Sequence, residues 1–425
     1  MNAIRATRRL GKAGPEVSII GLGCMGMSDF YGPADETESL STIRAALDAG
    51  ITLLDTGDFY GMGHNELLLR EALKGSRRER LFIQVKFGAQ RDPTGAFLGY
   101  DARPAAVKTA LAYTLRRLNT EYVDLYQPAR LDPAVPIEDT LGAVADCVRA
   151  GYVRHIGLSE MGADTIRCAH AVHPIIAVQL EYSLMSRGLE REILPAVRAL
   201  GIGVTAYGVL SRGLLSDAQR KPPAGSDFRA HFPRFQGENL QQNQALVQAL
   251  HRIATGRGVT PTQLAIAWVL SRGDDIVPLI GARTRAQLSE AMGALEISLT
   301  AEELDRIARI VPADQVAGTR YGPAQMAMLD SERPESQSGG PLWNTCARWI
   351  SQRLSGAALT SASPSLCWIM PRVPRAVRSI ASRPRRAGDP RRACTCMTSI
   401  RSSTSCGARC GSRSKARNTI AGPAR

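Results

Sequence analysis

Three side chains near the ends of two apolar segments have the types and spacing needed to move a proton. Asp55 follows the apolar segment Thr52–Leu54, Tyr60 comes a few residues later, and Lys86 ends the next apolar segment. A free phenol has a pKa of about 10, which is too high for efficient proton donation near neutral pH. A neighbouring ammonium favours the phenolate, and a buried carboxylate would hold that ammonium in place. Together the three residues predict a general acid at Tyr60, although each alone has an ordinary structural explanation.

The elements that would position these residues follow a regular alternation. Short apolar segments typical of buried strands alternate with longer amphipathic segments between residues 17 and 311. Strands are expected at Val17–Gly21, Thr52–Leu54, Leu81–Lys86, Tyr122–Tyr126, Val153–Leu158, Ile176–Gln179, Gly203–Ala206 and Ile276–Ile280. Helices are expected at Glu36–Ala49, Asn65–Leu73, Pro104–Leu118, Ile137–Ala150, Asp164–Val172, Glu190–Leu200, Leu240–Arg257, Thr262–Ser271, Thr284–Leu295 and Ala301–Val311.

Eight strand–helix units predict an α/β protein with a (β/α)₈ TIM barrel, because buried parallel strands need helices on their outer face. A doubly wound sheet is the alternative. Thr7–Leu10 and Glu16–Ser18 are expected to form an N-terminal β-hairpin that closes the bottom of the barrel. The active site of such a barrel lies at the carboxyl ends of its strands, which is where Asp55 and Lys86 occur.

One long segment, Ser211–Glu238, interrupts the alternation and contains several phenylalanines. Long loops in compact domains are often functional, so this segment is a candidate lid over the site. The spacing of Phe228, Phe232 and Phe235 equally fits a local cluster that holds the loop against the barrel, and we favour that explanation.

The net charge of +14 lies entirely in the last part of the chain. Residues 334–425 contain sixteen Lys and Arg but only Glu335 and Asp389 as acidic residues, so residues 1–333 are neutral overall. We therefore expect a barrel domain over 1–333 and a basic Arg/Ser-rich tail over 334–425 with little order. An out-of-frame extension of the gene explains this composition best. A nucleic-acid-binding arm is a less favoured explanation, and a zinc site at its Cys394, Cys396, Cys406 and Cys410 is the least favoured.

The remaining composition is typical of a soluble cytoplasmic protein. The chain has no run of about 18 apolar residues that would span a membrane, and no leader sequence is recognisable at its start. Cys24, Cys147 and Cys168 are the three cysteines before the tail, and their wide spacing is more typical of reduced thiols than of a disulfide framework. No metal site is expected in the barrel.

Several longer motifs occur in a fixed order. They are Ile20–Ser28, Asp55–Gly61, Tyr122–Gln127, Pro136–Thr140, Gly151–Ser159 and Gln179–Ser183. With these motifs the chain resembles the aldo-keto reductase superfamily over roughly residues 5–333. The resemblance implies a (β/α)₈ barrel that binds NADPH without a Rossmann fold and reduces a small aldehyde or ketone substrate.

The resemblance also assigns the catalytic residues. The family tetrad is Asp, Tyr, Lys and His, and the first three correspond to Asp55, Tyr60 and Lys86. The histidine position is Ala129, which cannot donate a hydrogen bond to a carbonyl, and one missing donor typically costs about 10²–10³ in rate. This absence leaves open a second function, an NADPH-binding regulatory or redox-sensor module without catalysis. Neither His64, expected to cap a helix, nor His155, expected to be a structural histidine within its strand, is predicted to replace the missing imidazole.

Cofactor contacts follow from the same motifs. Gly21, Gly23 and Gly26 match a dinucleotide fingerprint, but the polar loop that follows them does not fit a Rossmann unit. In the family these glycines instead let the first strand approach the cofactor. The implied cofactor residues are Gly23 and Met25 on the first strand and its loop, Ser159 and Gln179 for the carboxamide, Tyr207 for stacking on the nicotinamide, Gly208, Leu210 and Gly213 for the pyrophosphate, and Gly281, Arg283, Arg285, Gln287 and Glu290 for the adenosine end. Of the two arginines, Arg283 is the first choice for the 2′-phosphate. The chain departs from the family pattern at Glu160 and Ala291, where asparagines are common.

Overall fold

A computed structural model describes residues 4–28, 30–216 and 227–333. Eight parallel strands close into a barrel in which sequence neighbours pair and the last strand pairs with the first. The strands are β3 (Gly21–Gly23), β4 (Leu53–Gly57), β5 (Phe82–Phe87), β8 (Val123–Pro128), β9 (Val153–Ser159), β10 (Ile175–Glu181), β11 (Gly203–Tyr207) and β12 (Ile276–Gly281). The predicted (β/α)₈ barrel is therefore confirmed, and the open doubly wound sheet is excluded.

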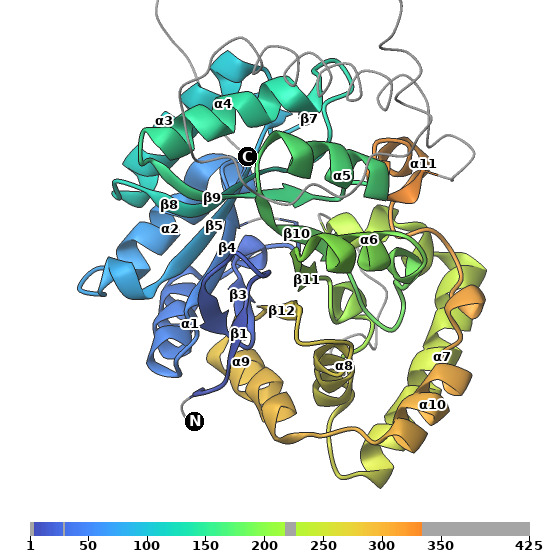
Figure 1. The fold of residues 1–425 in the computed structure, drawn as a ribbon. Helices are drawn as coiled ribbons and strands as arrows, with labels where there is room; N and C mark the ends of the chain where they lie inside the picture. The colour runs from blue at the N-terminus through green and yellow to red at the C-terminus, as the bar shows by residue number, and fades with distance from the viewer. Residues whose placement is uncertain (1–3, 29, 217–226, 334–425) are drawn as a thin grey trace, which may run out of the picture. The chain divides into compact units, whose positions relative to one another are not determined.

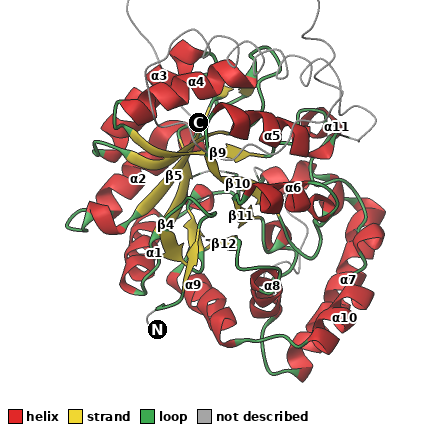
Figure 2. Ribbon diagram, in the orientation of Figure 1, coloured by secondary structure: helices red, strands yellow, loops and turns green. Residues whose placement is uncertain are grey.

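Helices surround the strands and shield their outer face from water (Figures 1 and 2). They are α1 (Glu36–Asp48), α2 (His64–Ala72), α3 (Pro104–Leu118), α4 (Ile137–Arg149), α5 (Ala163–Val172), α6 (Ile193–Leu200), α7 (Gly237–Gly256), α8 (Pro261–Leu270), α9 (Arg285–Met292), α10 (Ala301–Ile310) and α11 (Pro323–Met326). Local signals fix their ends: the Thr260 and Thr300 side chains form capping boxes, and Gly201 ends α6 in the left-handed region.

The predicted N-terminal hairpin is present, and it consists of antiparallel β1 (Thr7–Arg9) and β2 (Glu16–Ser18). Its Leu10 and Val17 side chains pack with interior residues of the barrel strands. The predicted strand Val17–Gly21 was wrong in its bounds, because its first residues belong to the hairpin and the barrel strand is Gly21–Gly23. Glycine is required at Gly21, since a Cβ there would lie 2.5 Å from the Leu53 side chain.

A second hairpin, β6 (Ala89–Arg91) and β7 (Phe97–Tyr100), follows β5 and was not predicted. Its strands are short, and Phe97 and Leu98 are exposed, so the segment lacks the alternation of apolar and polar residues that indicates a strand. Phe97 and Tyr100 both reach the cavity described below.

The loop expected to be a lid forms three short 3₁₀ turns over its described residues, 211–216 and 227–238. Phe232 and Phe235 are buried, and the ring of Phe228 contacts those of Phe232 and Phe30 edge-on. This bears out the favoured explanation, an aromatic cluster that holds the loop down, although Phe228 also lines the cavity. Residues 217–226 lie outside the described part of the loop.

The whole basic tail, 334–425, lies outside the described residues, so the structure tests none of the explanations offered for it.

Cys24 and Cys147 are free and buried, as expected, whereas Cys168 is disulfide-bonded, which contradicts the expectation of a reduced thiol. None of the helices in the described ranges is long and apolar enough to cross a membrane.

Candidate active site

A cavity of about 840 Å³ opens at the carboxyl ends of the barrel strands. Most residues predicted for the site line it together. These are Gly23, Met25, Asp55, Tyr60, Lys86, Gln179, Tyr207, Gly208, Leu210, Gly213, Gly281, Arg283, Gln287 and Glu290. Ser159 is fully buried behind the cavity wall, and Arg285 lies outside it.

The Asp55 carboxylate is the centre of a buried hydrogen-bond cluster. Its Oδ1 accepts from Lys86 Nζ at 2.6 Å, from Gln84 Nε2 at 2.8 Å and from Gln179 Nε2 at 2.8 Å. The register of β4 and β5 places Gln84 directly opposite Asp55 and Lys86 two residues further along, opposite Gly57. Burial lowers the pKa of Lys86, and the Asp55 charge opposes that effect. Gln179, expected at the nicotinamide carboxamide, therefore also holds Asp55.

Tyr60 follows β4 on a tight turn that glycines make possible. Gly61 and Gly63 both have positive φ, at 55° and 96°, and Met62 is held at 55° between them. The Tyr60 ring is 5% exposed, and the Lys86 ammonium lies 5.1 Å from its centroid. Edge-on contacts with Phe59 and Phe30 fix the ring, and the hydroxyl makes no hydrogen bond to another described residue.

The pKa of Tyr60 differs from the expectation. Burial and the Asp55 carboxylate raise the pKa of Tyr60 well above its usual value, and Arg130 is the cation that opposes this. The predicted lowering of this pKa is not seen, because burial and the Asp55 charge outweigh the cations nearby. The cavity therefore holds a neutral phenol.

Ala129 occupies the end of β8 and lines the cavity, and no other side chain supplies an imidazole there. No histidine is among the described residues that line this cavity. His155 stacks on Phe82 within the barrel, and His64, the first residue of α2, contacts Ser28, which confirms that neither replaces the missing histidine. The next residue, Arg130, does line the cavity, and the sequence analysis missed it. Its position directly after a strand end is the signal that could have found it.

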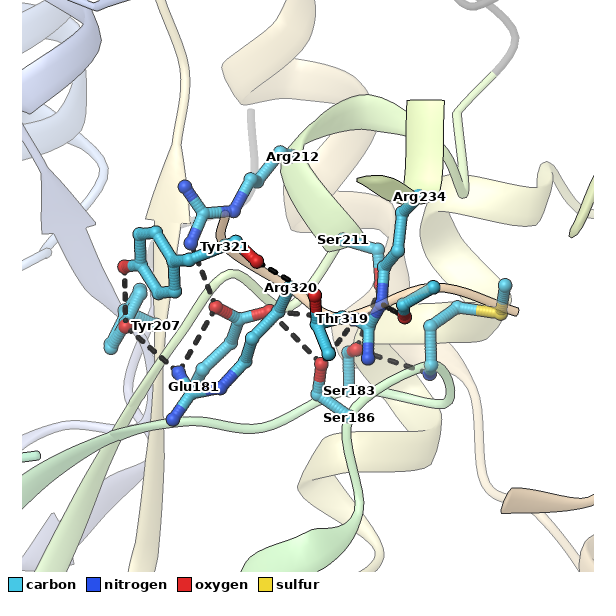
Figure 3. Close-up of polar contacts among 12 residues, drawn as sticks. Glu181, Ser183, Ser186, Tyr207, Ser211, Arg212, Arg234, Thr319, Arg320 and Tyr321 are labelled. Atoms are coloured by element: carbon cyan, nitrogen blue, oxygen red, sulfur yellow. Dashed lines mark hydrogen bonds and ion pairs between the residues drawn. The ribbon is translucent and has the colours of Figure 1, made fainter. Parts of the chain in front are cut away.

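A buried ionic cluster, which we call the arginine network, lies beside the cavity, and Figure 3 shows its part around Glu181. It comprises Glu160, Glu181, Arg212, Arg234 and Arg320. Arg320 Nη1 lies 3.0 Å from Glu160 Oε1 and 3.3 Å from Glu181 Oε2, and Arg212 Nη2 lies 2.9 Å from the same Glu181 oxygen. Despite their burial, both carboxyls have a lowered pKa because of these arginines, that of Glu181 to about 2.

Two tyrosines connect the arginine network to the cavity. Arg320 Nη1 donates to the Tyr207 hydroxyl at 3.2 Å, and that hydroxyl lies 3.1 Å from the hydroxyl of Tyr321. Both tyrosine rings line the cavity. Sequence reasoning missed Arg320 and Tyr321, because they follow the last barrel unit and lie more than a hundred residues from Glu160, Glu181 and Tyr207. The network also explains Glu160, which departs from the family pattern because it pairs with Arg320.

The two arginines at the start of α9 have different surroundings. Arg283 lines the cavity, and its guanidinium donates to the carbonyl oxygens of Tyr31, at 3.0 Å, and Pro33. Arg285 instead pairs with the Glu38 carboxylate at 2.9 Å, and its side chain is 60% exposed. Gln287 Oε1 accepts from the Arg283 backbone nitrogen at 2.8 Å.

These features agree with comparisons to known proteins. Residues 19–312 match the sequence model of the Aldo/keto reductase family. The chain is 43% identical over 317 residues to the probable aldo-keto reductase 1 of Glycine max, covering 74% of this chain and 91% of that protein. Similar solved structures include a glycerol dehydrogenase of Gluconobacter oxydans (30% identity, TM-score 0.66) and an aldo-keto reductase of Bacillus halodurans in its holo form (29% identity, TM-score 0.61). Each covers 72% of this chain, and 96% of the solved chain is matched.

The chain belongs to the aldo/keto reductase family. Members of this family are oxidoreductases that act on small carbonyl compounds with a nicotinamide cofactor. The predicted family is therefore confirmed, and so is the absence of a Rossmann unit, because Gly21–Gly23 is barrel strand β3 and a 3₁₀ turn rather than a helix follows it.

The residues present fit a nicotinamide dinucleotide. Gly208 and Gly213, at the end of β11, adopt φ of 65° and 93°, so the backbone turns there without side chains that would fill the cavity. A Cβ at Gly281 would meet no atom within 4 Å, which leaves open space beside the end of β12. Arg283 adds a cation beside that space.

Proposed function

We propose that this protein reduces aldehydes or ketones to alcohols with NADPH and that Tyr60 donates the proton. The observation that carries this proposal is the placement of the buried Asp55–Lys86 pair beside the neutral Tyr60 phenol, in one cavity with Arg283. When bound, the cofactor supplies a hydride to the carbonyl carbon. The carbonyl oxygen takes the proton from the Tyr60 hydroxyl as the hydride arrives, and an alcohol results.

The other residues support the phenol as it loses its proton. The Lys86 ammonium, 5.1 Å from the ring centroid, favours the phenolate that forms, and Asp55 keeps Lys86 charged and oriented. Gln84 and Gln179 fix Asp55 from two sides. Because the ring is buried, little water competes for the proton.

The cofactor residues are assigned from the family motifs, and all of them except Ser159 and Arg285 line the cavity. Gly23 and Met25 would lie along the cofactor, Ser159 and Gln179 would hold the carboxamide, and Tyr207 would stack on the nicotinamide. The remaining assignments are Gly208, Leu210 and Gly213 for the pyrophosphate, Gly281, Gln287 and Glu290 for the adenosine, and Arg283 before Arg285 for the 2′-phosphate. A preference for NADPH over NADH follows from a guanidinium at that end, since it can make paired bonds to a phosphate. The cytoplasmic location stays a prediction.

The second candidate function is a cofactor-binding sensor module, and Ala129 is the observation that favours it. Turnover separates the two functions. We would follow NADPH oxidation by the full chain with reactive aldehydes, α-dicarbonyls and aromatic ketones, using Tyr60→Phe as the control. The reductase proposal expects turnover that Tyr60→Phe lowers by about 10² or more. No turnover with any carbonyl, with NADPH binding intact, would overturn it in favour of the sensor.

A further inference from the structure

Arg130, which follows β8, and Arg283, which follows β12, both line the cavity and form no ion pair with an acidic side chain of the described residues. Two other cavity arginines are neutralised: Arg212 pairs with Glu181, and Arg229 pairs with Asp227. A further one, Arg91, lies over the Phe30 ring. Arg283 has an assigned anion, the 2′-phosphate of the cofactor, whereas Arg130 has none.

Arg130 is held only by neutral groups. Its Nη1 donates to the Ala129 carbonyl at 2.6 Å and lies 3.5 Å from Ser159 Oγ, and its Nη2 donates to the Tyr321 hydroxyl at 3.2 Å. A guanidinium has five N–H donors, so these contacts leave capacity for a further acceptor. Glu160 acts on this cation from beyond ion-pair distance and is itself paired with Arg320, so an anionic ligand in the cavity could approach Arg130 more closely.

Further cations lie close to Arg130. Arg212, Arg234 and Arg320 belong to the adjoining arginine network, where they pair with the carboxylates of Glu160, Glu181 and Glu332. Although burial alone would raise the pKa of Tyr321, Arg212 and Arg130 hold it below its usual value. The region around the Tyr321 hydroxyl therefore favours negative charge.

The position of Arg130 in the barrel argues against a cofactor phosphate as its partner. In the closed order of eight strands, β8 and β12 lie four strands apart in either direction and so face each other across the barrel. The phosphates are assigned to Arg283 after β12 and to the turn after β11. The nicotinamide carboxamide, expected near Ser159 and Gln179, is neutral. The remaining candidate is a charge on the substrate.

We propose that Arg130 binds a carboxylate carried by the substrate next to its reacting carbonyl, and so orients that carbonyl toward Tyr60 in place of the imidazole missing at Ala129. The preferred substrates are then 2-oxo acids and related carboxylated carbonyl compounds. A planar guanidinium suits a carboxylate because the two can form paired hydrogen bonds. This inference rests on the proposed reductase function.

The test compares benzoylformate with its methyl ester, which keeps the ketone and removes the charge. The full chain should have a higher kcat/KM for benzoylformate. Arg130→Met should lower that value about 10- to 100-fold and lower the value for the ester clearly less, because the ester loses only the effect of Arg130 on the Tyr60 phenol. Arg130→Lys keeps the positive charge but not the paired N–H donors of the guanidinium, so its kcat/KM for benzoylformate should lie between those of Arg130→Met and the unmodified chain. The dissociation constant of NADPH, measured by its fluorescence, should stay unchanged.

Arg149→Met is the matched control, because the Arg149 side chain is 71% exposed on α4. It should leave the ratio between the two substrates unchanged. Equal losses for acid and ester in Arg130→Met would overturn the inference, since Arg130 would then act on the phenol in general. Weakened NADPH binding would also overturn it, by making Arg130 a cofactor residue.

A failure of the reductase function is distinguishable from a failure of this inference. If no carbonyl is turned over, binding of benzoylformate to the NADP⁺-loaded protein is measured by calorimetry. Saturable binding that Arg130→Met abolishes would support the carboxylate site even without catalysis. Absence of binding in the unmodified chain would overturn it.

Discussion

The Asp55–Lys86 pair and the Glu160–Arg320 pair are both buried ion pairs, but they face different parts of the molecule. Asp55 and Lys86 lie on adjacent strands and line the cavity, with Tyr60 beside them. Glu160 and Arg320 belong instead to segments 160 residues apart in the chain. The first pair presents a reactive group to a ligand, and the second fastens the segment after the last barrel unit to the barrel.

This difference indicates how each pair should respond to substitution. Removing one partner of a buried ion pair leaves the other charge uncompensated, which is strongly destabilising. When Lys86 is removed, Asp55 still accepts hydrogen bonds from the amides of Gln84 and Gln179. The substitution should therefore lower the reaction rate more than the stability of the fold. Glu160 would keep the Ser331 hydroxyl as a donor at 2.6 Å but no cation as close as Arg320, so the loss should fall mainly on stability.

The largest expected effect is the loss of reaction rate in the Lys86→Met variant. Without the ammonium, the Asp55 charge raises the pKa of Tyr60 further, and Arg130 is left as the cation that favours the phenolate. We expect kcat for the best carbonyl substrate to fall by about 10²–10⁴. Lys108→Met is the control, because Lys108 forms the same kind of pair with Asp146 at 2.8 Å on the surface. A loss below about tenfold would contradict the role assigned to Lys86.

Arg320→Met should show the opposite pattern in a urea titration. We expect the free energy of unfolding to fall by about 3–5 kcal/mol, because Glu160 and Glu181 both lose a partner. Arg198→Met, which breaks a more exposed pair with Asp275, should cost at most about 1 kcal/mol. Similar losses of unfolding free energy in the two variants would show that the arginine network stabilises the fold no more than a more exposed ion pair does.

Arg283→Ala tests the adenosine end of the cavity. The dissociation constant of NADPH should rise about 10- to 100-fold while that of NADH changes little, because only NADPH carries the 2′-phosphate. Arg285→Ala should have a smaller effect, since Arg285 is already paired with Glu38. Equal losses for NADPH and NADH in Arg283→Ala would refute the phosphate assignment.

The smallest expected effect concerns Asp58, which lies between Asp55 and Tyr60 in the chain. Burial and the nearby Glu66 raise the pKa of Asp58 to about 8, and its Oδ1 has no hydrogen-bond partner among the described residues. The folded protein therefore binds this proton more tightly than the unfolded chain, whose aspartates titrate near about 3.9. The resulting stability is complete below that pH and is lost as pH rises toward 8.

Asp58→Asn should remove this pH dependence. Each pH unit between the two pKa values costs the wild-type protein about 1.4 kcal/mol at most. We expect the variant to gain at least about 1 kcal/mol over the wild type between pH 5 and pH 8, measured by urea unfolding. Asp305→Asn, on the exposed face of α10, should show no such gain. A parallel pH profile for Asp58→Asn and wild type would contradict the raised pKa.

The sequence was sufficient to predict the barrel, and most of the site residues predicted from it line the cavity at the carboxyl ends of the strands. Seven of the eight barrel strands were predicted nearly in place, because a strand buried on both faces is a run of apolar residues that can be recognised locally. Only the first strand was misplaced, since β3 is short and contains two glycines. Asp55 and Lys86 followed from the same local rule, because the ends of parallel strands meet at one edge of the barrel.

Tertiary structure alone decided which charges are neutralised. The sequence could not show that Arg285 pairs with Glu38 while Arg283 stays beside the cavity, or that burial and the Asp55 charge raise the pKa of Tyr60 despite Lys86. Nor could it show that Arg320 returns to Glu160 and leaves Arg130 without an acidic partner in the described structure. The physical reason is that strand patterns depend on neighbours in the chain, whereas the pairing of charges depends on distances set by the closed barrel.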